Sequence, residues 1–333
     1  MSDVARRAGV SVKTVSNVVN AFPHVRDSTR LRVEEAIAEL GYEVNETARS
    51  LRKGRTGLIA LAVPELSQPY FAQLADDILV AARACGLHVL IDPTGFSREA
   101  ELAALDNPRR HVVDGLLFSP VALDPADAGL VEVDYPLVLL GEQLFSPAVD
   151  HVTMRNREGA RAATELLLRH GRRRIAVLGA PHEGARGTST LRYAGYVDAL
   201  RDAGIEVDPR LVAWTDDGWH RPNGAVAISG VLGTGVRPDG VVAFNDALAV
   251  GAMHELQVRG LRVPDDVAVV GWDDTEDAGY TTPSLTSVDG GRAEIARVAV
   301  ALLAQRIAGR GPAEPVLHHA DLRVVERDST PRG

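Results

Sequence analysis

A row of side chains near the amino terminus has the spacing of one helix face. Val12, Lys13, Ser16, Asn17 and Asn20 occupy positions i, i+1, i+4, i+5 and i+8, which form one contiguous stripe. A lysine can donate to guanine, an asparagine can pair with adenine, and a valine can touch a thymine methyl group. The stripe therefore carries the residue types that read base edges in the DNA major groove.

Two short helices would have to position this stripe. Residues 2–8 carry apolar side chains at helical spacing, Gly9 permits a sharp turn, and Ser11 is a good N-cap for a second helix over 12–20. This pattern predicts a helix-turn-helix, in which the second helix points its amino-terminal end into the groove. From these residues alone, an ordinary helical hairpin with a solvated polar face remains the alternative.

A third helix is predicted over residues 27–40, with a cap at Asp27-Ser28-Thr29 and a stop at Gly41. Residues 45–53 form at most a short and very polar helix, which is not expected to be stable alone in water. The apolar stripe predicted for the third helix consists of Leu31, Val33, Ile37 and Leu40.

Beyond residue 57, short apolar runs alternate with amphipathic helical stretches. This β/α alternation predicts parallel sheets with helices on both faces, and its two successive series predict two similar lobes with a cleft between them. Ligands of open α/β sheets bind at the carboxyl ends of the strands, so the residues after each strand are binding candidates. The expected strands are 58–63, 88–91, 115–118, 137–140, 174–178, 211–213, 240–244 and 267–271. The expected helices are 70–84, 99–107, 158–170, 190–203, 223–232 and 247–259.

Length, charge and cysteine usage narrow the class of protein. A chain of 333 residues with 45% hydrophobic residues suggests two or three folding units. The net charge of −9 by itself argues against nucleic-acid binding, but residues 1–57 carry ten Lys/Arg against seven Asp/Glu, which suggests a small domain that meets a polyanion. The single Cys85, the lack of an export signal and the lack of a long apolar run favour a soluble protein of the cytoplasm.

Common catalytic signatures are missing from the sequence. There is no Gly-x-Gly-x-x-Gly after a strand, no Walker loop and no nucleophile elbow. His318 and His319 fall in an expected strand and would point to opposite faces, which suits no single metal ion. We therefore expect neither an enzyme, nor a cofactor, nor a metal site.

Several strings carry a specific resemblance to a known family. Near the amino terminus they are Asp-Val-Ala-Arg-Arg-Ala-Gly-Val-Ser (3–11), Thr-Val-Ser-Asn-Val-Val-Asn (14–20) and Ala-Ile-Ala-Glu-Leu-Gly-Tyr (36–42). Further along they include Arg-Tyr-Ala-Gly-Tyr (192–196), Phe-Asn-Asp-Ala-Leu-Ala-Val-Gly-Ala (244–252) and Val-Pro-Asp-Asp-Val-Ala-Val-Val-Gly-Trp-Asp-Asp (263–274). Over essentially its whole length the chain resembles the LacI/GalR family of bacterial repressors.

The resemblance implies three segments. These are an all-α helix-turn-helix headpiece (1–44), a hinge helix with a linker (45–56), and a two-lobed α/β domain of parallel sheets like that of periplasmic binding proteins (57–333). The hinge helix would order on DNA and wedge Leu51 into the minor groove, although Leu51 could instead pack on the large domain. The family commonly has Arg where Asn17 stands, so the base preference there should differ. The implied DNA-binding residues are Ser11, Val12, Lys13, Thr14, Ser16, Asn17, Asn20, His24, Asn45, Ala48, Arg49 and Leu51.

The resemblance also implies a small-molecule effector between the lobes, most often a sugar. Phe71 and Trp219 would stack on it, and arginine and aspartate side chains would bind its polar groups. Two of these residues also have a structural interpretation, Asp246 as a helix cap and Asp273 as a structural acid, and Arg186 could simply be solvated. The implied effector-binding residues are Tyr70, Phe71, Arg186, Thr188, Arg192, Trp219, Asn245, Asp246 and Asp273.

One departure from the family pattern concerns the kind of effector. Met154-Arg155 is expected to stand where the family has an Asp-Asn pair. Arg155 would then lie near Arg186 and Arg192, which leaves an anionic or carbonyl-rich effector open beside a neutral sugar.

The resemblance finally implies a homodimer, because two headpieces must act together on a palindromic operator. The leucine-heptad tail of family tetramers is missing, so a dimer is favoured. The expected function is transcriptional repression under effector control. A helix-turn-helix activator, or a solute-binding protein without a DNA function, is the alternative.

Overall fold

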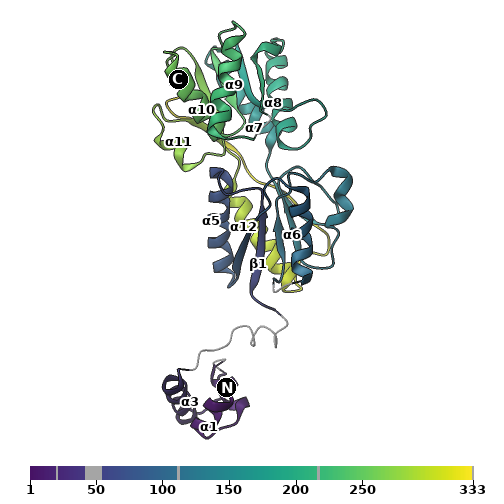
Figure 1. The fold of residues 1–333 in the computed structure, drawn as a ribbon, viewed down its shortest axis with the longest axis vertical. Helices are drawn as coiled ribbons and strands as arrows, with labels where there is room; N and C mark the ends of the chain where they lie inside the picture. Colours follow the sequence, from purple (N-terminus) through teal and green to yellow (C-terminus); the bar gives the residue numbers. More distant parts are fainter. Residues whose placement is uncertain (20–21, 42–54, 111–112, 216–217, 332–333) are drawn as a thin grey trace. The chain divides into compact units, whose positions relative to one another are not determined.

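A computed structural model describes residues 1–19, 22–41, 55–110, 113–215 and 218–331. The chain divides into two units, Met1–Thr56 and Gly57–Gly333, which are described separately (Figure 1). No helix in the described ranges is long and apolar enough to cross a membrane. Five of the predicted DNA-binding residues lie outside the described residues: Asn20, Asn45, Ala48, Arg49 and Leu51.

The described part of the amino-terminal unit holds the helices α1 (Ser2–Ala8), α2 (Val12–Val19) and α3 (Asp27–Leu40). Gly9 turns the chain after α1 with a φ of 65°, in the left-handed region that favours glycine. The Ser11 Oγ accepts a hydrogen bond from the Thr14 amide at 3.1 Å and caps α2, as its sequence position predicts. The buried core consists of Val4, Ala5, Ala8, Val15, Val18, Val33 and Ala36.

The apolar stripe predicted for α3 is wrong at its two leucines. Leu31 and Leu40 are exposed, whereas Ala36 is buried and Ile37 packs against the core. The inner face is the narrow row of Val33, Ala36 and Ile37, at spacing i, i+3 and i+4, because only one side of α3 meets α1 and α2. The predicted cap is wrong as well, since α3 follows Arg26 without a side-chain cap.

The larger unit contains two six-stranded sheets, whose strand orders are β11-β5-β4-β3-β1-β2 and β12-β10-β9-β8-β6-β7. Neighbouring strands are parallel, except for the antiparallel pair of β10 and β12. The strands of the first sheet are β1 (Leu58–Val63), β2 (His88–Pro93), β3 (Leu116–Phe118), β4 (Leu137–Leu140), β5 (Asp150–Thr153) and β11 (Leu317–His319). Those of the second are β6 (Ile175–Ala180), β7 (Val212–Trp214), β8 (Gly240–Ala243), β9 (Ala268–Trp272), β10 (Thr286–Asp289) and β12 (Arg323–Val325).

Helices cover these sheets and define two lobes. The first lobe contains the first sheet with α5 (Pro69–Ala84), α6 (Arg98–Arg110), the 3₁₀ helix η1 (Pro125–Val131) and α12 (Arg292–Ile307). The second lobe contains the second sheet with α7 (Asn156–Arg169), α8 (Thr188–Asp202), the 3₁₀ helix η2 (Pro209–Leu211), α9 (Arg221–Gly233), α10 (Asp246–Val258) and α11 (Glu276–Tyr280). The predicted β/α alternation is therefore confirmed.

The carboxyl-terminal part of the chain interleaves the two lobes, which the sequence did not predict. Helix α12 returns to the first lobe, where it packs beside α5 (Figure 1). The chain passes between the lobes after β5, after β10 and after β11. These connections lie at the β5/β11 edge of the first sheet and the β10/β12 edge of the second. The opposite edges, β2 and β7, carry no connection between the lobes.

Candidate functional sites

A cavity of about 410 Å³ is lined by loops that follow strands of both sheets. Its volume lies in the range of small-molecule sites. Eight of the nine predicted effector residues line it. The first lobe supplies Tyr70 and Phe71, and the second supplies Arg186, Thr188, Arg192, Trp219, Asn245 and Asp273.

Aromatic rings reach the cavity from both lobes. Tyr70 and Phe71 stand at the start of α5 with their rings edge to face, 5.2 Å apart between centroids. Burial raises the pKa of the Tyr70 hydroxyl. Trp219 is held by Asn245, whose side-chain amide donates to the Trp219 carbonyl at 2.9 Å. Asn245 also caps α10 by accepting from the Leu248 amide, so one side chain both begins a helix and positions an aromatic wall.

Arg192 is buried and already has protein partners. Its Nε donates to the Asn156 Oδ1 at 2.7 Å, and its Nη1 donates to the Phe244 carbonyl. The guanidinium lies 3.9 Å from the ring centroid of Trp272 and 5.6 Å from that of Trp219, which is cation–π geometry. Burial lowers the pKa of Arg192. These contacts fix the guanidinium and limit what it can offer to an anion.

Asp273 faces the cavity with an unsatisfied carboxylate. It directly follows β9, has a φ of 102°, and is only 7% exposed. No side-chain hydrogen bond joins it to another described residue, although it lines the cavity. Burial raises the pKa of the Asp273 carboxyl. The positive charge of Arg192 lowers this pKa, but its effect is smaller than that of burial. The oxygens of Asp273 are therefore available to a ligand hydroxyl or to another donor in the cavity.

Glu142 is a cavity residue that the sequence analysis missed. Its Oε1 accepts from the Thr153 hydroxyl at 2.6 Å and from the Met154 amide at 3.2 Å. Its Oε2 accepts from the Thr188 hydroxyl at 2.6 Å, and this bond joins the first lobe to the first residue of α8 in the second. Glu142 follows the predicted strand 137–140 by two residues, so a complete search of the strand ends would have found it.

Gly187, immediately before α8, lies against Gln143 of the first lobe. A Cβ atom at this position would lie 2.5 Å from the Oε1 of Gln143 in the first lobe. The φ of 82° at Gly187 is also in the left-handed region. The loop after β4 therefore lies against the start of α8. Because the Gln143 Oε1 is the end of a flexible side chain and can move, the positive φ is what favours glycine at this position.

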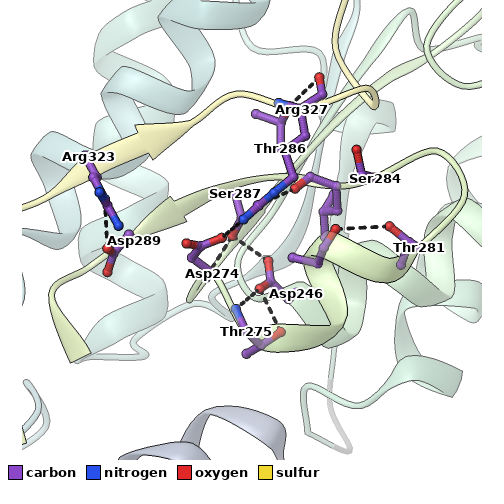
Figure 2. Close-up of polar contacts among 12 residues, drawn as sticks. Asp246, Asp274, Thr275, Thr281, Ser284, Thr286, Ser287, Asp289, Arg323 and Arg327 are labelled. Atoms are coloured by element: carbon purple, nitrogen blue, oxygen red, sulfur yellow. Dashed lines mark hydrogen bonds and ion pairs between the residues drawn. The ribbon is translucent and has the colours of Figure 1, made fainter. Parts of the chain in front are cut away.

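Asp246 does not line the cavity, contrary to the sequence expectation. Its Oδ1 accepts from the Ser287 hydroxyl at 2.6 Å, and its Oδ2 accepts from the Thr275 amide at 2.7 Å and from the Thr275 hydroxyl at 3.0 Å. These bonds tie the start of α10 to β10 and to the loop after β9 (Figure 2). Asn245 occupies the capping position of α10, and Asp246 is the first residue of the helix. The side chain of Asp246 is therefore not needed as the cap, and it bonds to the neighbouring strand and loop instead.

The expected cluster of three arginines is not assembled. Arg155 is exposed and does not line the cavity, Arg186 lines it with an exposed side chain, and Arg192 is bound internally. The residue that hydrogen-bonds to Arg192 is Asn156, whose side-chain oxygen accepts from the Arg192 Nε. Asn156 follows the expected Met154-Arg155 pair by one residue. Sequence reasoning missed Asn156 because the pair was placed one residue too early to include it.

The amino-terminal unit presents the predicted stripe on the outer side of α2. Ser11, Val12 and Lys13 are exposed, and no described acidic side chain forms an ion pair with Lys13. The remaining described stripe residues, Ser16 and Asn17, are half-buried, and so is the further DNA-binding candidate Thr14. The Thr14 hydroxyl lies 2.9 Å from the Ser11 hydroxyl, so these two side chains also cap α2.

His24 lies in the segment between α2 and α3. Its side chain is exposed, and its ring meets Phe22 edge to face at 5.8 Å. Phe22 is itself exposed, and its amide donates to the Asn17 carbonyl at the end of α2. The segment therefore presents a pair of aromatic rings next to the predicted recognition helix.

Comparisons with known proteins agree with this geometry. The family described as "Bacterial regulatory proteins, lacI family" matches residues 1–45, and the family described as "Periplasmic binding protein-like domain" matches residues 164–330. The transcriptional regulator CelR of Thermobifida fusca is 35% identical, over 98% of this chain and 96% of its own. The chain belongs to the lacI family of bacterial regulatory proteins.

Solved structures of lacI-family proteins show the same fold. A lac repressor dimer bound to operator and the anti-inducer ONPF has a TM-score of 0.86 and 31% identity, over 98% of both chains. A CelR–cellobiose complex has a TM-score of 0.73 and 32% identity, also over 98% of both chains. This chain is therefore a helix-turn-helix transcriptional regulator, with an all-α headpiece followed by a two-lobed α/β domain.

Proposed function

We propose that this lacI-family protein is a repressor that binds a palindromic DNA operator as a homodimer, and that a neutral carbohydrate in the cavity controls this binding. The observation that carries the effector is the Asp273 carboxyl group, which faces the cavity and has no side-chain hydrogen bond to another described residue. The proposed segments are a headpiece at 1–44, a hinge and linker at 45–56, and the effector and dimerisation domain at 57–333. DNA binding would place its action in the cytoplasm.

The chemistry of the cavity favours a hydroxylated, uncharged effector. Asp273 supplies a carboxyl group that can bind a ligand hydroxyl. The oxygens of Glu142 already accept from Thr153, Met154 and Thr188, so Glu142 adds mainly negative charge, which disfavours anions. Arg192 is held by Asn156 and the Phe244 carbonyl, so it has fewer donors left for an anion, and the other cavity arginine, Arg186, has an exposed side chain. The aromatic side chains Phe71 and Trp219 can cover the apolar faces of a sugar ring.

Control would act through closure of the lobes. A ligand that touches both lobes favours one closure angle, and it shifts DNA binding only by its difference in affinity for the two states. The Glu142–Thr188 hydrogen bond joins the two lobes next to the cavity. An effector on this side of the cavity would alter this bond and thereby the closure of the lobes. We infer that the cavity binds its ligand without transforming it, in keeping with relatives that are regulators.

Two assays on the full chain test this proposal. Selection from a random DNA library should return a pseudo-palindrome, and binding should weaken steeply with salt. The Asn17→Arg variant should change the preferred base at a half-site position, because Asn17 lies on the outer side of α2, whereas the exposed Arg310→Ala control in the large domain should not. An unchanged motif for Asn17→Arg would show that α2 is not the recognition helix.

The effector class is tested by thermal shift with neutral sugars, sugar acids and sugar phosphates. A ligand of the folded state raises the melting temperature, so at least one neutral sugar should do so while the acids and phosphates do not. A shift with only the anionic compounds would refute the neutral class.

A further inference from the structure

The edges of the two sheets show where the cavity is open. All three connections between the lobes run at the β5/β11 and β10/β12 edges. The lobes are therefore joined on one side, and the loops after β2 and β7 flank the cavity on the other. A ligand too long for the cavity would extend past these two loops.

Trp214 stands at the free edge, as the last residue of β7. Its side chain is 54% exposed, which is unusual for a residue that is highly buried on average. Its ring stacks on that of His182, with 6.2 Å between centroids and 24° between planes. His182 follows β6 and lines the cavity, so the exposed tryptophan continues the cavity wall outward.

Two further features of the cavity lining point to a ligand. Thr215 lines the cavity, and its hydroxyl oxygen is buried without a hydrogen-bond partner. Phe96 lines the cavity from the loop after β2 in the first lobe, and it is 47% exposed with a φ of 57°. Non-glycine residues at such φ values cost free energy and are concentrated at binding sites.

We propose that Trp214 and His182 form an outer subsite for a second sugar ring, so that the effector is an oligosaccharide of at least two rings. This inference rests on the proposed carbohydrate effector. The inner ring lies against Trp219 and Asp273, and the outer ring places its apolar C–H face on Trp214. A hydroxyl of the ligand supplies the partner that the Thr215 oxygen lacks. Trp214 thereby selects the length of the effector, and Asp273 anchors it.

Two series of sugars that differ in linkage test the subsite by calorimetric titration of the full chain. The first is glucose, cellobiose and cellotriose, and the second is glucose, maltose and maltotriose. In at least one series the disaccharide should bind about tenfold more tightly than glucose. Trp214→Ala should remove this gain and leave glucose binding unchanged, and Trp214→Phe should restore most of it.

A matched control and an optical signal separate binding from folding. Phe145 is 51% exposed and does not line the cavity, so Phe145→Ala should bind both disaccharides like the wild type. Acrylamide quenching of tryptophan fluorescence should fall when the disaccharide is added to the wild type, because the outer ring covers Trp214. With glucose it should fall much less.

The outcomes distinguish the subsite from the effector class. If a sugar binds but affinity does not rise with length, or if Trp214→Ala weakens glucose as much as the disaccharide, the subsite is refuted and the carbohydrate effector stands. If no sugar of either series binds and neutral sugars give no thermal shift, both proposals are refuted.

Discussion

Asp246 and Asp273 occupy similar places in the chain and have opposite surroundings. Each comes shortly after a buried parallel strand of the second lobe, and each is more than nine-tenths buried. Asp246 accepts three hydrogen bonds from Ser287 and Thr275, whereas Asp273 has no side-chain hydrogen bond to a described residue. Burial raises the pKa of both carboxyl groups.

The difference separates a structural acid from a binding acid. A buried acceptor that is satisfied by the protein contributes to stability, and removing it leaves its donors without a partner. An acceptor that faces a cavity and has no bond to a described side chain or backbone group is available to a ligand. The same residue type at the end of a strand therefore serves folding at one position and, in our proposal, recognition at the other.

The largest expected effect is the loss of stability in Asp246→Ala. Removing this carboxylate leaves the Ser287 and Thr275 donors buried and unpaired, so the free energy of unfolding should fall by about 3 kcal/mol. Urea unfolding followed by tryptophan fluorescence measures it, since all three tryptophans lie in the second lobe. A loss no greater than that of Asp273→Asn would break the contrast between the two acids.

A smaller effect, on affinity, is expected for Asp273→Asn. Asparagine keeps the size of the side chain and tolerates the positive φ better than alanine would. The variant should bind the effector more weakly by about 1.5–3 kcal/mol, because a charge-assisted hydrogen bond is lost. DNA binding without effector should stay close to that of the wild type. Calorimetry with the sugar found by thermal shift measures the first quantity, and titration of the operator measures the second.

A loss of stability in Asp273→Asn as large as that in Asp246→Ala, together with unchanged effector affinity, would reverse the assignment of the two acids. In that case Asp273 would be the structural residue, and the anchor of the ligand would have to be sought at Glu142.

The smallest expected effect is a dependence of the free energy of unfolding on pH. Burial raises the pKa of Asp246 to about 7, whereas the unfolded carboxyl titrates near about 4. The folded state therefore holds a proton that the unfolded state has released, so the free energy of unfolding should fall as the pH rises from about 4 to about 7 and then level off. Asp273 contributes with the same sign.

Urea midpoints at pH 5, 6, 7 and 8 check this slope. Asp246→Asn should flatten it, and the exposed Asp76→Asn control should leave it unchanged. An Asp246→Asn variant whose midpoint depends on pH in the same way as that of the wild type would contradict the raised pKa.

Much of the fold was predictable because its signals are local. The turn at Gly9, the cap at Ser11 and the alternation of buried strands with helices depend on a few neighbouring residues each. The strands β5 and β10 were missed because they contain polar residues such as Asp150 and Ser287, which are buried only through distant partners. Helix α12 was missed because its return to the first lobe depends on contacts with α5, more than two hundred residues earlier in the chain.

The candidate site shows the same division. The sequence by itself determined that this is a lacI-family chain with a helix-turn-helix. It also determined that residues at strand ends, such as Tyr70, Trp219 and Asp273, surround one cavity. Short motifs were sufficient for this, because they specify the order of the strands and the residues of the turns. Only the tertiary structure decided that Asp246 is tied to β10, that Glu142 joins the lobes, and that Arg192 is held by Asn156. Those roles depend on which donors lie next to a buried group, and such donors come from segments that are distant in the sequence.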